Sequence, residues 1–167
     1  MGHASSPDIG VGSGAMAIRT FTSYDELEKA VGEDLGTTDW LTVTQQRVDA
    51  FAEATGDHQW IHVDVERARQ GPFGGTVAHG YLTLSLIAQF GPQLFALETP
   101  GPRLNYGVNK VRFPHPVLVG SRIRATATFL ELRDVPAGRQ LVIRWVIAIE
   151  GEDKPACVAE TVALLMP

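Results

Sequence analysis

The stretch "AHGYLTLSLIAQFGPQLFAL", residues 78–97, decides the fold of this chain. From Tyr81 to Leu97 it carries no charged side chain. A helix that is apolar nearly all round is buried on most of its sides. Gly91 and Pro92 interrupt the run, which is too short for the about 20 continuous apolar residues of a membrane span. The stretch therefore predicts a long core helix and no membrane association.

Short elements are predicted on the N-terminal side of this helix. Residues 23–36 predict a helix that begins at Ser23 and ends near Gly32, and residues 39–43 predict a short strand. Residues 44–56 predict a helix that ends at Gly56. Residues 65–71 predict one or two further helical turns before Gly71 and Pro72.

Strands are predicted on the C-terminal side, over residues 103–113, 121–132, 139–151 and 156–165. In the first of them, Val108, Lys110 and Arg112 are expected to share one face. Helices followed by strands indicate an α+β fold with an antiparallel sheet. We expect this sheet to curl around the helix. One sheet covers an all-apolar helix only in part, so we also predict a homodimer.

Composition limits the functional classes. The 167 residues predict one domain, the 44% hydrophobic content suffices for a core, and the net charge of −5 argues against nucleic-acid binding. The single cysteine, Cys157, allows no intrachain disulfide, which is typical of a reducing compartment and predicts a cytoplasmic protein. Residues 1–16 are rich in Gly and Ser and are interpreted as a disordered tail or cloning remnant, leaving 17–167 as the single domain.

Titratable groups gather in "ATGDHQWIHVD", residues 54–64. Asp57 and His62 are five residues apart across a loop, so both side chains can turn toward one point and hold one water. Histidine accepts a proton near neutral pH, since its unperturbed pKa is about 6.5. Gly56 allows a sharp turn at the end of the preceding helix. The pattern predicts a general acid–base pair.

A second feature is "TVAHGY", residues 76–81, at the start of the long helix. The first backbone N–H groups of a helix lack intrahelical acceptors and carry partial positive charge. Gly80 has no side chain to block approach. A developing oxyanion would be stabilised there by about 3–4 kcal/mol for a well-placed donor. Together with the acid–base pair, this predicts chemistry next to a carbonyl group.

These segments resemble the MaoC-like (R)-specific enoyl-CoA hydratases of the hot-dog superfamily. The likeness lies in Thr-Gly-Asp, then Ile-His-x-Asp, then Ala-His-Gly before a long apolar helix, and in "NYGVNKVRFPHPVLVGSRIRATATFLEL". The resemblance implies a hot-dog fold, in which the sheet wraps the helix and two chains pair side by side. It also implies that Asp57 and His62 are catalytic and that the Gly80 N–H binds the thioester oxygen.

The implied reaction is reversible hydration of trans-2-enoyl-CoA to (R)-3-hydroxyacyl-CoA, with no metal and no redox cofactor. Relatives commonly carry Asn-Pro before Ile-His, where this chain has Gln59 and Trp60. Trp60 is therefore expected to shape the pocket wall and the substrate preference. His79 is expected near the site as a hydrogen-bonding group that contacts substrate. Lys110 and Arg112 are expected to contact the phosphates of coenzyme A.

Several alternatives stay open at this stage. The 54–64 loop is compatible with a simple helix-capping segment, or with a zinc site that uses Asp57, His58, His62 and Asp64. The function is compatible with a 3-hydroxyacyl-carrier-protein dehydratase, which shares the site logic. It is also compatible with a hot-dog acyl-CoA thioesterase, although the helix lacks a carboxylate, or with a non-catalytic acyl-binding dimer.

Overall fold

A curved antiparallel sheet forms the body of the molecule, a computed structural model that describes residues 17–167. The predicted tail, residues 1–16, lies outside the described residues. The main strand order is β2-β6-β7-β8-β5, and β3 also pairs with β6. These strands are β2 (Asp34–Thr37), β3 (Leu41–Thr42), β5 (Arg103–Arg112), β6 (Arg122–Val135), β7 (Gly138–Ile149) and β8 (Cys157–Leu165). The predicted α+β class and antiparallel sheet are confirmed.

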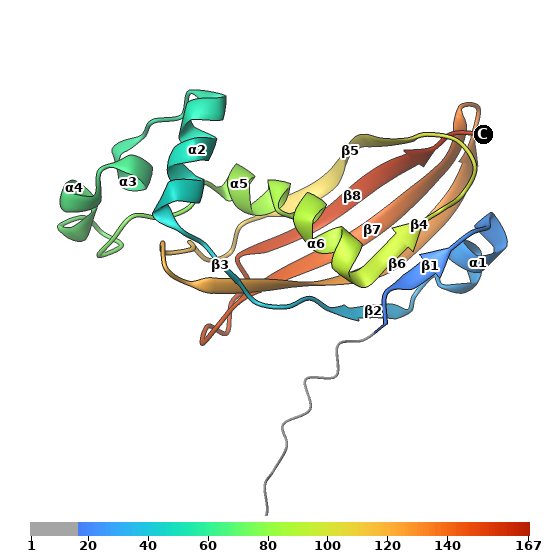
Figure 1. The fold of residues 1–167 in the computed structure, drawn as a ribbon, viewed down its shortest axis with the longest axis horizontal. Helices are drawn as coiled ribbons and strands as arrows, with labels where there is room; N and C mark the ends of the chain where they lie inside the picture. The colour runs from blue at the N-terminus through green and yellow to red at the C-terminus, as the bar shows by residue number, and fades with distance from the viewer. Residues whose placement is uncertain (1–16) are drawn as a thin grey trace, which may run out of the picture.

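Two short helices take the place of the predicted long one. Helix α5 (Gly80–Ser85) and helix α6 (Ile87–Leu94) meet at Leu86 and lie along one face of the sheet (Figure 1). The prediction that the helix continues to Leu97 is wrong, because the backbone becomes extended at Phe95. Residues Phe95–Leu97 form β4, which pairs in parallel with β1 (Arg19–Phe21). Among the described helices, none has the length and apolar character needed to cross a bilayer.

The sheet covers only one side of the two helices. Leu82, Leu86, Phe90 and Leu94 are buried against the core. The opposite side is open in the single chain and presents Tyr81, Ser85, Ala88, Gln89 and Pro92. The single sheet thus covers the helices only in part, as the sequence analysis expected, and the predicted burial of the other side depends on the predicted second copy.

The remaining helices position the start of α5. Helix α2 (Gln45–Thr55) begins at Thr44, whose hydroxyl accepts a hydrogen bond from the Arg47 N–H, and ends at Gly56 with a φ of 78°. Helix α3 (Trp60–Val63) and helix α4 (Val65–Arg69) follow, and all three gather at one end of the sheet (Figure 1). Helix α1 (Tyr24–Lys29) lies at the other end and begins at Ser23 as predicted. Strand β2, which is separated from that helix by residues 30–33, was not predicted.

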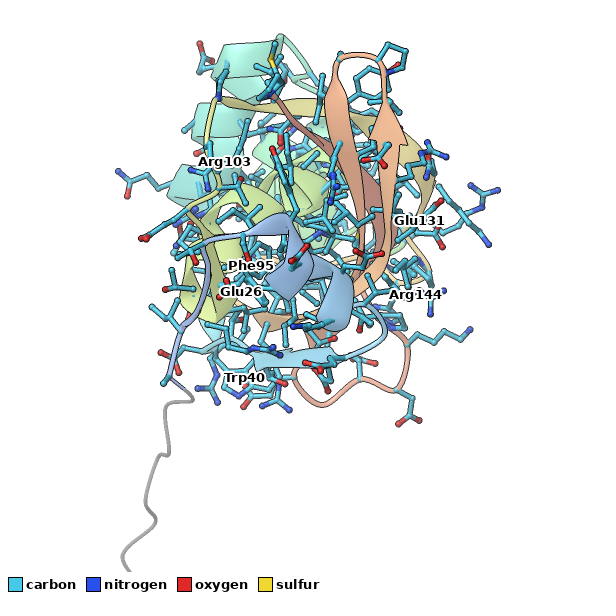
Figure 2. All side chains as sticks on the ribbon, turned by 90° about the vertical axis from the view of Figure 1, so that its right-hand side faces the viewer. Glu26, Trp40, Phe95, Arg103, Glu131 and Arg144 are labelled. Atoms are coloured by element: carbon cyan, nitrogen blue, oxygen red, sulfur yellow. The ribbon has the colours of Figure 1, made fainter. Side chains whose placement is uncertain are left out.

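An aromatic cluster holds the end of the sheet where α1 lies. The Phe129 ring of β6 lies 5.2 Å from the Phe21 ring and 5.1 Å from the Phe95 ring, measured between centroids. The Trp145 ring lies 6.0 Å from Phe95. Figure 2 views this end and labels Phe95 beneath α1. Tilted and edge-on ring pairs of this kind add to the stability that burial supplies.

Two irregularities in β5 change the predicted faces of that strand. Val108 pairs with Thr161, whereas Lys110 pairs with the adjacent residue Glu160, so one extra residue lies between them. Successive residues of β8 point to opposite faces. The predicted common face for Val108 and Lys110 is therefore wrong: Val108 shares the helix-side face, and Lys110 shares the outer face with Glu160. The outer face also carries Glu131 and Arg144 (Figure 2).

Phe129→Ala should lower the free energy of unfolding by about 3–5 kcal/mol, because it leaves a cavity beside the rings of Phe21 and Phe95. Phe129 is fully buried, whereas Glu131 is exposed on the same strand. Glu131→Ala should therefore change stability by no more than about 0.5 kcal/mol. Urea unfolding followed by tryptophan fluorescence measures the free energy of unfolding of both variants. Equal effects of the two substitutions would show that the aromatic cluster does not stabilise this end of the sheet.

Candidate active site

Asp57 stands where the chain leaves α2. Gly56 adopts the left-handed conformation that ends the helix, and Asp57 follows with its side chain 53% exposed. One carboxylate oxygen, Oδ1, accepts a hydrogen bond from the Gln59 N–H at 3.4 Å. The rest of the carboxylate is free to meet water or a ligand from solvent.

His62, in α3, is buried and has its tautomer fixed by a backbone group. Its Nδ1 lies 2.6 Å from the Val77 carbonyl oxygen. Because a carbonyl oxygen only accepts, Nδ1 carries the proton and Nε2 is left with a lone pair. A neutral ring in this tautomer can accept a proton through Nε2.

His79 lies between Asp57 and His62. Its Nε2 donates a hydrogen bond to the Asp57 backbone carbonyl at 2.9 Å and is 4.0 Å from the Asp57 Oδ2. Its ring stacks on that of His62, with centroids 3.8 Å apart and planes at 23°. His79 also directly precedes Gly80, the first residue of α5. It therefore touches the segments that carry each of the three predicted catalytic groups.

The three polar side chains converge on one place. A carboxylate oxygen of Asp57 and one ring nitrogen each from His62 and His79 all lie within 4.8 Å of one another. His62 and Gly80 also line a common cavity of about 340 Å³. The cavity's apolar walls come from Phe73, Val77, Phe113 and Val117, among others. The arrangement places an acid–base pair beside the start of a helix, at the edge of an apolar pocket.

Gly80 must be a glycine for a packing reason. A Cβ atom built on Gly80 would lie 2.9 Å from Cδ2 of Phe113. Real Cβ atoms do not approach carbon this closely, so any side chain would displace the Phe113 ring from the cavity wall. The backbone N–H of Gly80 belongs to the first turn of α5, where amides have no acceptor within the helix.

Burial lowers the pKa of His62 from its ordinary value of 6.5. The hydrogen bond to Val77 and the negative charge of Asp57 act in the opposite direction, and the neighbouring His79 adds to the lowering. The net direction favours a neutral imidazole at neutral pH, which is the form that a general base requires.

Gln45 and Thr76 support His62, and the sequence analysis did not identify either. The Gln45 amide donates to the His62 carbonyl oxygen at 2.8 Å, and its Oε1 accepts from the Thr76 hydroxyl at 2.6 Å. The buried Thr83 hydroxyl, one turn into α5, was also missed although Thr83 lines the cavity. These residues are far apart in sequence and belong to no shared motif, so only the folded chain shows that they meet.

Three predicted substrate-contacting residues lie away from the cavity. The Trp60 ring packs over the Arg67 guanidinium at 4.3 Å and against Gly71. Lys110 and Arg112 pair with Glu160 and Val158 and project from the outer face of the sheet. None of the three is among the described residues that line the cavity, so their contacts with substrate remain predictions.

The zinc alternative finds little support in the geometry. Asp64 caps α4 by accepting a hydrogen bond from the Arg67 N–H, and His58 is exposed beside Glu53. A tetrahedral zinc ion with bonds of about 2.0–2.1 Å needs ligand atoms about 3.4 Å apart. The Nε2 of His79 is 4.0 Å from the Asp57 carboxylate and already donates to a carbonyl oxygen. The cluster is arranged for hydrogen bonding.

Comparison with known proteins identifies the family of this chain. The family model of the MaoC like domain matches residues 26–150, which include the whole of the 54–64 loop and the start of α5. The chain belongs to the MaoC-like dehydratase family. It is thus a member of a hydratase/dehydratase enzyme family, and the predicted resemblance is confirmed.

This MaoC-like protein is 50% identical over 146 residues to 3-hydroxyacyl-thioester dehydratase Z of Mycobacterium tuberculosis, covering 87% of this chain and 97% of the relative. Its fold is similar to that of the (R)-hydratase from A. caviae involved in PHA biosynthesis, with a TM-score of 0.66, 26% identity and coverage of 81% and 96% of the two chains. A monoamine oxidase regulatory protein from Archaeoglobus fulgius gives a TM-score of 0.72, 25% identity and coverage of 90% and 98%. The predicted hot-dog fold is confirmed.

The His62 ring should titrate below pH 6.5, the ordinary value for histidine. A histidine whose pKa is lowered in the folded state destabilises the fold as pH falls. As pH falls, the unfolded chain binds the proton at a higher pH than the folded chain does. The loss of unfolding free energy therefore begins near pH 6.5 and is complete below the pKa of His62 in the folded state. NMR titration of the His62 ring measures the pKa directly. Urea unfolding between pH 7.5 and 5 should show a smaller acid-induced loss of stability for His62→Gln than for wild type.

Proposed function

We propose that this protein is an (R)-specific enoyl-CoA hydratase that adds water reversibly to trans-2-enoyl-CoA, giving (R)-3-hydroxyacyl-CoA. The observation that carries the proposal is the convergence of the Asp57 carboxylate with a ring nitrogen of His62, beside the cavity that Gly80 lines. The contact of the His62 Nδ1 with the Val77 carbonyl oxygen leaves Nε2 as the nitrogen that can accept a proton. The relative named as a 3-hydroxyacyl-thioester dehydratase and the (R)-hydratase with a similar fold support the same class of reaction.

In the proposed mechanism Asp57 and His62 hold one water between them. The water oxygen attacks C3 of the enoyl thioester, and the electron pair of the double bond moves through C2 onto the thioester oxygen. The Gly80 N–H stabilises that oxygen by about 3–4 kcal/mol. As the water attacks, the Asp57–His62 pair takes one of its protons. A proton then passes from the pair to C2, which returns both side chains to their starting protonation state. Every atom of the product comes from the enoyl thioester and water, so the reaction is proposed to need no metal and no redox cofactor.

The larger cavity of the molecule supports an acyl substrate. Its volume is about 870 Å³, and it lies between α6 and strands β5, β7 and β8. It begins at Leu84, one helical turn from the Gly80 end of α5, and continues to Leu97. Apolar side chains predominate along it, including Ile87, Phe95, Ile143 and Val162. A hydrocarbon chain placed along this cavity would bury surface against its apolar walls, which is favourable at about 25 cal/mol per Å² buried. The cavity is open on the side of Ser85, Ala88 and Leu104, which are exposed in the single chain.

The open sides of α5, α6 and β5 support a homodimer. Strand β5 ends the sheet, and Leu104, Tyr106 and Val108 leave about half or more of their surface exposed on it. An edge strand with exposed apolar side chains readily accepts another chain. We therefore propose that a second copy covers this edge together with the outer side of the helices.

Asp57→Asn and His62→Gln should each lower kcat by about a hundredfold or more, because each removes one member of the acid–base pair. The assay follows the loss of enoyl-thioester ultraviolet absorbance with crotonyl-CoA, and chiral chromatography of the product determines its configuration. Equal activity of wild type and both variants would remove the catalytic assignment.

His58→Gln is a matched control for this assay. His58 adjoins Asp57 but is exposed and pairs with Glu53 at 3.6 Å, so its replacement should leave kcat unchanged. Dialysis against EDTA should leave wild-type activity intact, and a metal-dependent rate would contradict the proposed mechanism.

Comparing CoA-linked with carrier-protein-linked substrates of several chain lengths identifies the preferred thioester. Hydrolysis to free CoA would instead identify a thioesterase.

Light scattering after size-exclusion chromatography should give twice the 18.1 kDa mass of the chain. Tyr106→Asp should shift the protein toward the monomer, because it places a charge on the edge strand. Glu131→Lys, on the outer face of β6, should leave the mass unchanged. A wild-type protein that elutes as a monomer at all concentrations would contradict the proposed homodimer.

A further inference from the structure

His79 is a buried residue that the proposed reaction has not used. Its side chain is 2% exposed, and it is not among the described residues that line the catalytic cavity. Its Nδ1 is buried and has no hydrogen-bond partner among the described residues. Its Nε2 donates to the Asp57 carbonyl oxygen. Neither ring nitrogen is therefore open to substrate or to a water that moves protons.

The contacts of His79 instead join three separate segments of the chain. The hydrogen bond at 2.9 Å fixes the backbone of Asp57, 22 residues earlier. The His79 ring stacks on the His62 ring, with centroids 3.8 Å apart, and covers one face of it. The Phe51 ring of α2, at 5.0 Å, packs against the imidazole as well. His79 itself is the residue from which α5 and the Gly80 N–H begin.

The position of Asp57 depends strongly on this hydrogen bond. Asp57 is exposed and follows Gly56, a residue with wide backbone freedom. Its further hydrogen bonds are both local and 3.4 Å long: the Asp57 N–H donates to the Thr55 hydroxyl, and the carboxylate accepts from the Gln59 N–H. His62, in contrast, is held by Val77 and through its backbone by Gln45. Of the two predicted catalytic groups, Asp57 is thus the less firmly placed.

We infer that His79 is a positioning residue, which sets the distance between Asp57 and His62 by hydrogen bonding the backbone of one and stacking on the ring of the other. This inference rests on the proposed hydratase function. It replaces the sequence-based expectation that His79 contacts substrate. Misplacement of a reacting group by about 1 Å lowers rates by about a hundredfold, so the role is measurable through kcat.

Three substitutions separate the two contacts. His79→Phe keeps an aromatic ring over His62 but lacks the donor, His79→Gln keeps a donor for the Asp57 carbonyl but lacks the ring, and His79→Ala lacks both. We expect kcat with crotonyl-CoA to fall about a hundredfold in His79→Phe and His79→Ala. His79→Gln should stay within about tenfold of wild type, because it keeps the hydrogen bond that positions Asp57. KM should change little throughout, because the ring does not touch substrate.

A double substitution tests whether His79 acts through Asp57. Adding His79→Phe to Asp57→Asn should lower kcat no further than Asp57→Asn alone, since the group being positioned is already altered. Additive losses would overturn the inference. So would a rise in KM at constant kcat, which indicates substrate contact, or a folded His79→Gln no better than His79→Ala.

Crystal structures of wild type and His79→Gln or His79→Ala give a readout that does not depend on activity. In His79→Ala the Asp57 carboxylate should move away from His62, and in His79→Gln it should stay. An unmoved Asp57 in His79→Ala would overturn the inference even if the protein were inactive toward crotonyl-CoA. A wild-type chain without hydratase activity would, in contrast, overturn the proposed function, so the two failures are distinguishable.

Discussion

The fold depends on one constraint: the apolar side of α5 and α6 must be covered by the concave face of the sheet. Phe90, Leu82 and Leu94 are fully or nearly buried there, and four long strands curve to meet them. This packing fixes where α5 begins. It brings Gly80 to the end of the sheet at which α2, α3 and α4 gather, and so to the segment that carries Asp57 and His62. Placement of the proposed catalytic groups is thus a consequence of core packing, not of local sequence alone.

Much of this arrangement was predictable because periodic burial and local capping leave clear patterns. The alternation in "SRIRATATFLEL" predicted β6, and the sequence around Thr44 and Gly56 predicted both ends of α2. The end of the predicted long helix was wrong because tertiary pairing with β1 draws Phe95–Leu97 into a strand despite their apolar character. The shared face of Val108 and Lys110 was wrong because an extra residue in β5 reverses the alternation, and hydrophobic pattern does not reveal such an insertion.

The site shows the same division between local and distant information. Asp57, His62 and Gly80 stood out because their motifs are compact in sequence, and the fold brings them together. The partners that hold His62 in place did not stand out. Val77, Gln45 and Thr76 act through a backbone carbonyl, a side-chain amide and a hydroxyl, groups that many sequences could supply. Identifying such supports requires coordinates, since neither residue type nor spacing distinguishes them from ordinary polar residues.

The irregular register of β5 has a consequence for how the protein behaves at high concentration. Extra residues interrupt its pairing with β8 at two points, between Asn105 and Gly107 and between Val108 and Lys110. A regular strand from an unrelated chain needs evenly spaced N–H and C=O groups along its whole length, and this edge does not present them. The same edge that a matching copy would cover is therefore a poor template for open-ended filament growth. The interrupted register of β5 thus disfavours aggregation through this edge.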